Sequence, residues 1–353
     1  QEIYIISYIQ IITKIVNTIM IMILIYFKCD ILIVKLVSSM IFVLKPFIQN
    51  IYVKKKFNIN LNDSDSNFEI KRKWDGLAQH IAYVIQTNTD TTVLAIFSTV
   101  SEVSVYSVYM LIINGIRNLI TAFSSGIEAT FGDMIAKGEK ETLKENFKSY
   151  EFLYYMIITI ICICTIILVI PFVKVYTKGI SDVNYVREKF AIIIILSEFV
   201  YSIRKPYNSL VLAAGHFRET QIGAWIESIS NIIISCMLVS KYGMVGVAIG
   251  TLVSISIRTI EIIYYASKRI LERPVKEVCK KVIPLVCASV PVLFICQNLV
   301  KMNIDSFAGV IIYSIVVLII ATLIISVSNF LWNKEEAKKV FNKLKNIALG
   351  GLY

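Results

Sequence analysis

Apolar residues along this chain fall into separate blocks of about 20 residues, divided by short polar or basic gaps. A helix that crosses the ~30 Å hydrocarbon layer at ~1.5 Å per residue needs a block of this length. The pattern therefore predicts an all-α, polytopic transmembrane helix bundle of about ten helices. The predicted membrane segments are Ile3–Phe27, Ile31–Tyr52, Gly76–Phe97, Val103–Ala136, Phe152–Val175, Phe190–Ala213, Thr220–Ser240, Met244–Ser267, Val282–Leu299 and Phe307–Trp332.

Composition strengthens this prediction. Hydrophobic residues make up 56% of the chain, and the mean hydropathy of +0.70 is far above that of soluble proteins. A formal net charge of +11 is compatible with a nucleic-acid-binding protein, but the basic residues form no single patch. They gather in alternate gaps, which is the positive-inside pattern. We therefore expect a multi-pass membrane protein that has both chain ends in the cytoplasm and no nucleic-acid partner.

The gaps divide the chain into six parts. Residues 1–52 carry two helices, 53–75 a polar basic loop between two lobes, and 76–267 six helices with short connections. A second basic loop, 268–281, precedes two additional helices in 282–332. The basic tail 333–353 fits either an amphipathic helix on the inner membrane surface or a solvated segment. Because Gln1 stands directly before the first apolar block, we also expect the chain to be N-terminally truncated.

Polar residues recur at helical spacing inside four of the blocks. An ionisable side chain at membrane depth costs about 2.5–3.5 kcal/mol on insertion scales, so it is expected to face a hydrated interior. The spacing of these residues, three or four apart on one helix face, predicts a water-filled cavity between the four helices. The polar stripes are Gln79, Tyr83, Gln86 and Asp90; Asn114, Arg117, Asn118, Thr121, Ser125 and Glu128; Glu198, Tyr201, Arg204, Lys205 and Asn208; and Thr251, Ser254, Arg258 and Glu261.

Four cations are predicted to lie at one depth. Lys45, Arg117, Arg204 and Arg258 each stand about 14 residues from the outer end of their helix, or ~20 Å at ~1.5 Å per residue. Together with Lys205 they suit an anionic ligand such as a pyrophosphate headgroup. The alternative is that each cation pairs with a buried acid only to be tolerated in the bundle.

That alternative pairs Arg258 with Glu261 and Lys205 with Glu198. The candidates for ion coupling or a polar stripe are Asp90, Asn88, Asn114, Glu128 and Glu261. In the segment 88–90, side-chain oxygens could help to hold a coupling cation, and a buried hydrogen-bond cluster is the alternative there.

The sequence lacks the motifs that catalysis, metal binding and ATP hydrolysis require. The seven cysteines lie mostly inside apolar blocks without a CxxC pair, and His80 and His216 are the only histidines. No GxxxxGK[ST] motif is present for ATP hydrolysis. The sequence therefore predicts no catalytic residues, no metal site, no cofactor and no enzymatic activity.

Three segments carry a family resemblance. Gly76–Asp90, Tyr106–Gly138 and Ala214–Thr251 resemble the Wzx-type polysaccharide flippases of the multidrug/oligosaccharidyl-lipid/polysaccharide exporter superfamily. The resemblance implies two six-helix lobes, with 1–52 as the last two helices of the N-lobe and 76–267 as the C-lobe. Cationic residues that line the central cavity are a feature of that family, which fits Arg117, Arg204 and Arg258.

The resemblance also implies a function. It is the movement of undecaprenyl-pyrophosphate-linked oligosaccharide repeat units across the bacterial cytoplasmic membrane, for capsule or O-antigen-like surface polysaccharide. The implied partners are the lipid-linked oligosaccharide, membrane lipid and polysaccharide assembly proteins. Three alternatives remain open: a cation-coupled multidrug exporter of the same superfamily, a membrane polysaccharide polymerase or glycosyltransferase, and a structural subunit of an envelope complex.

Overall fold

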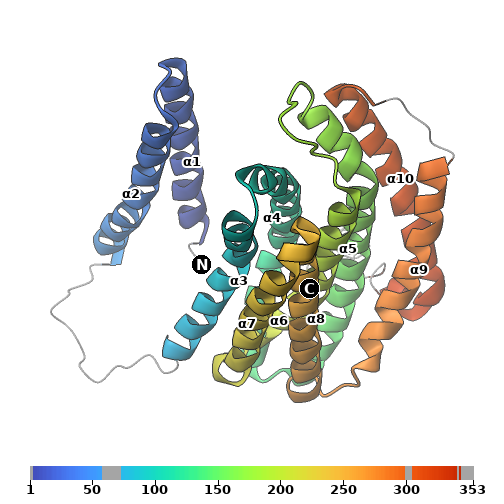
Figure 1. Ribbon diagram of the computed structural model, residues 1–353. Coiled ribbons are helices and arrows are strands. Elements are labelled where there is room, and N and C mark those ends of the chain that lie inside the picture. The colour runs from blue at the N-terminus through green and yellow to red at the C-terminus, as the bar shows by residue number, and fades with distance from the viewer. Residues whose placement is uncertain (1–2, 58–72, 299–303, 340–341, 343–353) are drawn as a thin grey trace. The chain divides into compact units, whose positions relative to one another are not determined.

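The computed structural model describes residues 3–57, 73–298, 304–339 and 342. In these residues it contains ten long α-helices, one for each predicted membrane segment, which confirms the all-α bundle (Figure 1). Eight of them are long and apolar enough to cross a membrane. The helices are α1 (Ile3–Tyr26), α2 (Ile31–Phe57), α3 (Lys73–Phe97), α4 (Val100–Lys137), α5 (Lys140–Tyr176), α6 (Glu188–Ala213), α7 (Phe217–Tyr242), α8 (Met244–Arg269), α9 (Lys276–Asn298) and α10 (Phe307–Trp332).

The two long helices that are not among these eight candidate membrane spans are α3 and α6. Their hydropathy is lowered by the same polar stripes that predict a cavity, because a helix that faces water on one side carries fewer apolar residues. Asp90 lies on α3, and Arg204 and Lys205 lie on α6. Charged residues of these stripes reduce the apolar content of both helices.

The chain divides into two compact units, residues 1–70 and 71–353. In the first unit, α1 and α2 pack against each other as a hairpin. The turn between them contains Lys28 in a left-handed conformation, with φ of 55°. The division falls inside the predicted loop 53–75, of which residues 58–72 lie outside the described residues.

In the second unit, α6 and α7 both pack closely against α8, and α3 packs against α7. On the other side of this group, α9 and α10 lie next to each other and against α5 (Figure 1). The chain after α10 continues as a helix over 334–339, where Ala337 packs on Phe152 of α5. This part of the tail is thus a packed helix, while 343–353 lie outside the described residues.

Close packing of α7 on α8 depends on two glycines. Gly246 and Gly250 have the GxxxG spacing that lets helix backbones approach closely in membranes. A Cβ atom at Gly250 would lie 2.3 Å from Ser235 Oγ, and one at Gly246 would lie 2.4 Å from the carbonyl oxygen of Leu238. No side chain fits at these two positions unless the helices separate.

Helix α5 is longer than its apolar block predicts. It begins at Lys140 instead of Phe152, because its first three turns are charged on one face and buried on the other. Leu143, Phe147 and Glu151 are spaced four apart and all three are buried. The predicted loop 268–281 is also shorter in the structure, since α9 begins at Lys276.

Candidate functional site

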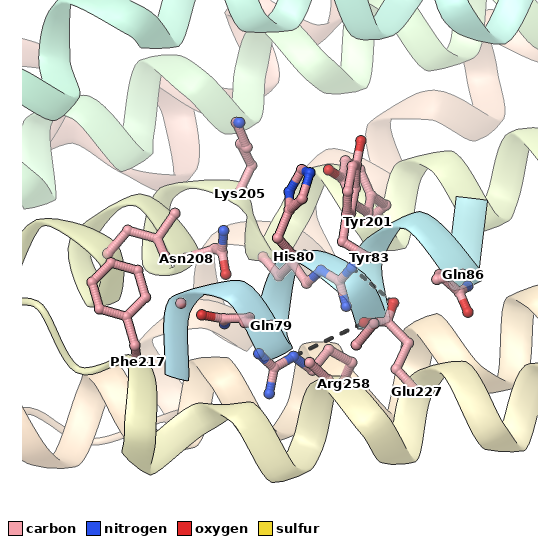
Figure 2. A pocket seen from close by; sticks show the side chains of 15 residues that line it. Gln79, His80, Tyr83, Gln86, Tyr201, Lys205, Asn208, Phe217, Glu227 and Arg258 are labelled. Carbon is pink, nitrogen blue, oxygen red and sulfur yellow. Dashed lines mark ion pairs between the residues drawn. The ribbon is translucent and has the colours of Figure 1, made fainter. Parts of the chain in front are cut away.

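The polar stripes of the second unit line two cavities that meet. One, of about 360 Å³, lies between α3, α6, α7 and α8, and its lining includes Arg204, Lys205 and Arg258 (Figure 2). The other, of about 890 Å³, lies between α3, α4 and α6. Tyr83, Tyr201 and Lys205 line both cavities, so the two lie next to each other. We call the first the charged cavity and the second, after the amides and hydroxyls that predominate among its polar groups, the neutral cavity.

The charged cavity is organised around Glu227 of α7. Glu227 Oε1 lies 2.8 Å from Nη2 of Arg204 on α6, and its Oε2 lies 3.9 Å from Nε of Arg258 on α8. These three side chains are at most 9% exposed. One carboxylate therefore links two guanidinium groups and connects α7 to α6 and α8.

Arg258 has further partners. Its Nη1 donates to the carbonyl oxygen of Thr220 at 2.6 Å and forms an ion pair with Glu261 one turn along α8. Gly223 makes room for this arrangement, since a Cβ atom there would lie 2.4 Å from Arg258 Nη1. The pair Arg258–Glu261 is one of the two that the sequence suggested.

The other suggested pair, Lys205 with Glu198, is wrong. Glu198 accepts a hydrogen bond of 2.8 Å from Nε of Arg117 on α4, while Lys205 Nζ lies 3.8 Å from Glu128. Both residues of the suggested pair stand on α6, seven positions apart, and each finds its partner on α4 instead. A partner from a packed neighbouring helix is not visible in the spacing along one helix.

A tyrosine lies beside two of the arginines that line the cavities. The ring of Tyr201 lies 5.3 Å from the guanidinium carbon of Arg117 and 4.8 Å from that of Arg204. A cation over an aromatic face is stabilised by the ring quadrupole. Arg117 and Arg204 are thus brought to one place in the bundle.

The neutral cavity presents mainly amides and hydroxyls. Asn114 and Asn118 of α4 line it together with Thr87 and Thr91 of α3. Arg117 and Lys205 bring positive charge to its border, and Glu198 is the carboxylate of its lining. This is a surface on which hydrogen bonds dominate.

Asp90 belongs to a separate, buried oxygen cluster. The hydroxyl of Thr251 lies 2.8 and 2.7 Å from its two carboxylate oxygens, Tyr106 OH donates to it at 3.2 Å, and Asn231 Nδ2 donates at 3.2 Å. Ser235 Oγ in turn donates to Asn231 Oδ1 at 3.0 Å. These hydrogen-bond partners of Asp90 are all neutral, and Asp90 forms no ion pair among the described residues.

The remaining predicted site residues are dispersed. Asn88 is exposed and donates to the Val84 carbonyl of its own helix, so it takes no part in the Asp90 cluster. Glu128 is partly exposed and accepts a hydrogen bond of 2.6 Å from Ser209. Lys45 lies on α2 in the first unit, and its membership of the cationic cavity stays a prediction.

Sequence reasoning missed the stripe on α7. Glu227, Asn231 and Ser235 are spaced four apart and are all buried, so they form one polar face that supplies both the charged cavity and the Asp90 cluster. The same spacing rule that found the other four stripes would have found this one.

Comparison with known proteins places the fold. No family model matches the chain, and no curated protein is similar to it. Its structure is similar to lipid II flippase MurJ in an inward closed conformation, with 18% identity and a TM-score of 0.56 over 90% of this chain and 66% of that one. A MOP superfamily transporter from Pyrococcus furiosus is similar with 14% identity and a TM-score of 0.47, over 76% of this chain and 65% of that one.

The chain thus spans about two thirds of the length of both solved structures. Its apolar helices and their arrangement define a multi-pass, all-helical membrane protein. More particularly, its fold is similar to that of about two thirds of lipid II flippase MurJ.

Proposed function

We propose that this chain acts in a flippase that moves undecaprenyl-pyrophosphate-linked oligosaccharide repeat units across the bacterial cytoplasmic membrane for surface polysaccharide synthesis. The observation that carries the proposal is the charge of the cavity lining. Arg204, Lys205 and Arg258 converge on the charged cavity, and Glu227 is the one carboxylate among the described residues that line it. Guanidinium groups bind phosphate oxygens bidentately, so this lining suits a pyrophosphate.

The neutral cavity suits the sugars of the same substrate. Its amides and hydroxyls can hydrogen-bond to sugar hydroxyls, and Tyr83 and Tyr201 stand where the two cavities meet. A pyrophosphate held in the charged cavity would leave its glycan beside these groups. The fold shared with MurJ, a lipid II flippase, supports a lipid-linked substrate.

Orientation follows from the basic residues. Lys137, Lys140, Arg218 and Lys268 stand at one end of the helices of the second unit, and the positive-inside rule assigns that end to the cytoplasm. The charged cavity lies nearer to this end, since it is lined by residues from the first turns of α3 and α7, such as Gly76 and Phe217. The headgroup would therefore meet the charged cavity first.

Asp90 is the strongest of the three candidates for ion coupling. Glu128 is hydrogen-bonded at the cavity border and Glu261 is paired with Arg258, whereas Asp90 is a buried carboxylate with neutral partners. A buried carboxylate whose hydrogen-bond partners are all neutral favours uptake of a proton or a cation. The hydroxyl oxygens of Thr251 and Tyr106 lie within hydrogen-bond distance of it, and the side-chain oxygen of Asn231 lies 3.3 Å from Thr251 Oγ1, a set of neutral oxygens that suits Na⁺ as well as H⁺.

The test is deletion of the gene that encodes this chain, followed by mass spectrometry of lipid-linked oligosaccharides with a membrane-impermeant probe of sidedness. Complete repeat units that accumulate on the inner face support the flippase. Unpolymerised repeat units on the outer face would instead indicate a polymerase. Unchanged glycolipids together with altered drug sensitivity would indicate the drug exporter.

Complementation with variants tests the cavity itself. Arg258→Ala should abolish export, and normal export by this variant would contradict a required role for the cation. Arg117→Lys keeps the positive charge but removes the planar guanidinium group. It therefore distinguishes bidentate hydrogen bonding to phosphate from electrostatic attraction alone. Glu102→Gln is a matched control, because Glu102 pairs with Arg187 away from both cavities.

A further inference from the structure

Glu227 stands where an anionic ligand would bind. We infer that its carboxylate is a built-in counter-ion, which occupies Arg204 in the unloaded protein and is displaced by the phosphate of the substrate. The inference rests on the proposed function, and it adds a residue that sets affinity and release.

The geometry singles out Arg204 as the guanidinium that changes partner. Its ion pair is with Glu227 Oε1 at 2.8 Å, and its other terminal nitrogen, Nη1, is buried without a hydrogen-bond partner among the described residues. The side chain is 9% exposed and lines the charged cavity. A buried, unpartnered donor at a cavity wall is free to bond to water, an ion or a ligand that enters the cavity.

Arg258 behaves differently. It is anchored by Glu261 and by the carbonyl oxygen of Thr220, and its contact with Glu227 is the longer one, at 3.9 Å. Among the described residues, loss of Glu227 would leave Arg258 with two partners and the Arg204 guanidinium with the ring of Tyr201. Figure 2 shows Glu227 beside Arg258. Arg258 thus keeps positive charge in place while Arg204 exchanges its ligand.

Ligand exchange explains how such a site can release what it binds. A phosphate that uses both terminal nitrogens of Arg204 replaces a carboxylate of the same sign, so binding yields only the difference between two ion pairs. When the ligand leaves, Glu227 returns to the guanidinium and no bare cation stays buried. Transport requires binding that is weak enough for departure, and this arrangement provides it.

Titration with inorganic pyrophosphate tests the inference directly. The full chain is purified in detergent, and binding is measured by calorimetry at fixed ionic strength for wild type, Glu227→Gln and the matched control Glu102→Gln. We expect Glu227→Gln to bind pyrophosphate about ten-fold more tightly, equivalent to about 1.4 kcal/mol. Glu102→Gln should match wild type, and adding Arg204→Gln to Glu227→Gln should remove the gain.

Several results would overturn the inference. They are equal or weaker binding by Glu227→Gln, the same gain in Glu102→Gln, or no pyrophosphate binding by either wild type or Glu227→Gln. If Glu227→Gln does not fold, Glu227→Asp replaces it. Its carboxylate is one methylene shorter and should give a smaller gain of the same sign, and affinity equal to wild type would again reject the role.

The glycolipid experiment decides the proposed function separately. Tighter pyrophosphate binding by Glu227→Gln without a glycolipid phenotype on gene deletion would keep the counter-ion and reject the flippase. Trapped repeat units with unchanged pyrophosphate affinity would keep the flippase and reject the counter-ion.

Discussion

Replacing Glu151 with glutamine should strongly destabilise the second unit. Glu151 is fully buried on α5 and accepts hydrogen bonds from Arg273 Nη2 at 2.8 and 2.9 Å and from Lys281 Nζ at 2.8 Å. Tyr207, directly after Pro206 in α6, also donates to it. One carboxylate therefore joins α5, α6, α9 and the α8–α9 connection at their basic end.

The expected loss in the free energy of unfolding follows from the two largely buried cations from which Glu151→Gln removes a counter-ion. The side chains of Arg273 and Lys281 are 11% and 5% exposed, and a neutral glutamine at this position would carry no charge to balance them. Removal of one partner from a buried ion pair typically costs about 3–5 kcal/mol. Glu277 at 3.5 Å from Arg273 and Glu336 at 3.4 Å from Lys281 compensate in part. We therefore expect a loss of about 3 kcal/mol, at the lower end of that range.

The assay is reversible unfolding in mixed micelles, with the free energy of unfolding measured against the mole fraction of denaturing detergent. Glu272→Gln is the matched control, because Glu272 pairs with Lys140 and Lys144 on the exposed surface and its loss should change little. Adding Lys281→Met to Glu151→Gln removes one orphaned cation and should recover part of the loss. A loss below about 1 kcal/mol in Glu151→Gln would refute the reasoning, because that is the size of a surface pair.

Three further predictions test other parts of the structure. Gly250→Val should cost about 1–3 kcal/mol in the same unfolding assay, since its side chain would overlap Ser235 on α7; an unchanged free energy would contradict the close approach of α7 and α8. Asp90→Asn should leave pyrophosphate affinity unchanged but remove the dependence of export on the ion gradient, and retained dependence would exclude Asp90 as the coupling group. Hydrogen bonds from two lysines of α5 hold the pKa of Glu272 below its ordinary value of 4.5, so its stabilising contribution is present above that pH and is lost as the pH falls through the lower folded-state pKa. Wild type should therefore lose slightly more stability than Glu272→Gln between pH 5 and pH 3 (about the window of an ordinary carboxyl) when unfolding is measured across that range.

Helix positions were predictable because hydrophobic length is a local property. Each apolar block corresponds to one helix, and the polar stripes on α3, α4, α6 and α8 place Arg117, Arg204 and Arg258 in cavity linings. Prediction failed where a helix continues through charged residues. The first turns of α5 are an example, because Glu151 is buried there only through partners from other helices.

The ion pairs depended on the tertiary structure. The order of residues alone required a membrane bundle that carries buried cations and buried acids, because the water-to-lipid cost of each charge restricts where it can stand. Helical spacing could suggest Arg258 with Glu261, but it could not bring Glu198 to Arg117 or Glu227 to Arg204. Those pairs join different helices, and only helix packing, which glycines such as Gly223 permit, decides which charges lie within 3 or 4 Å of each other.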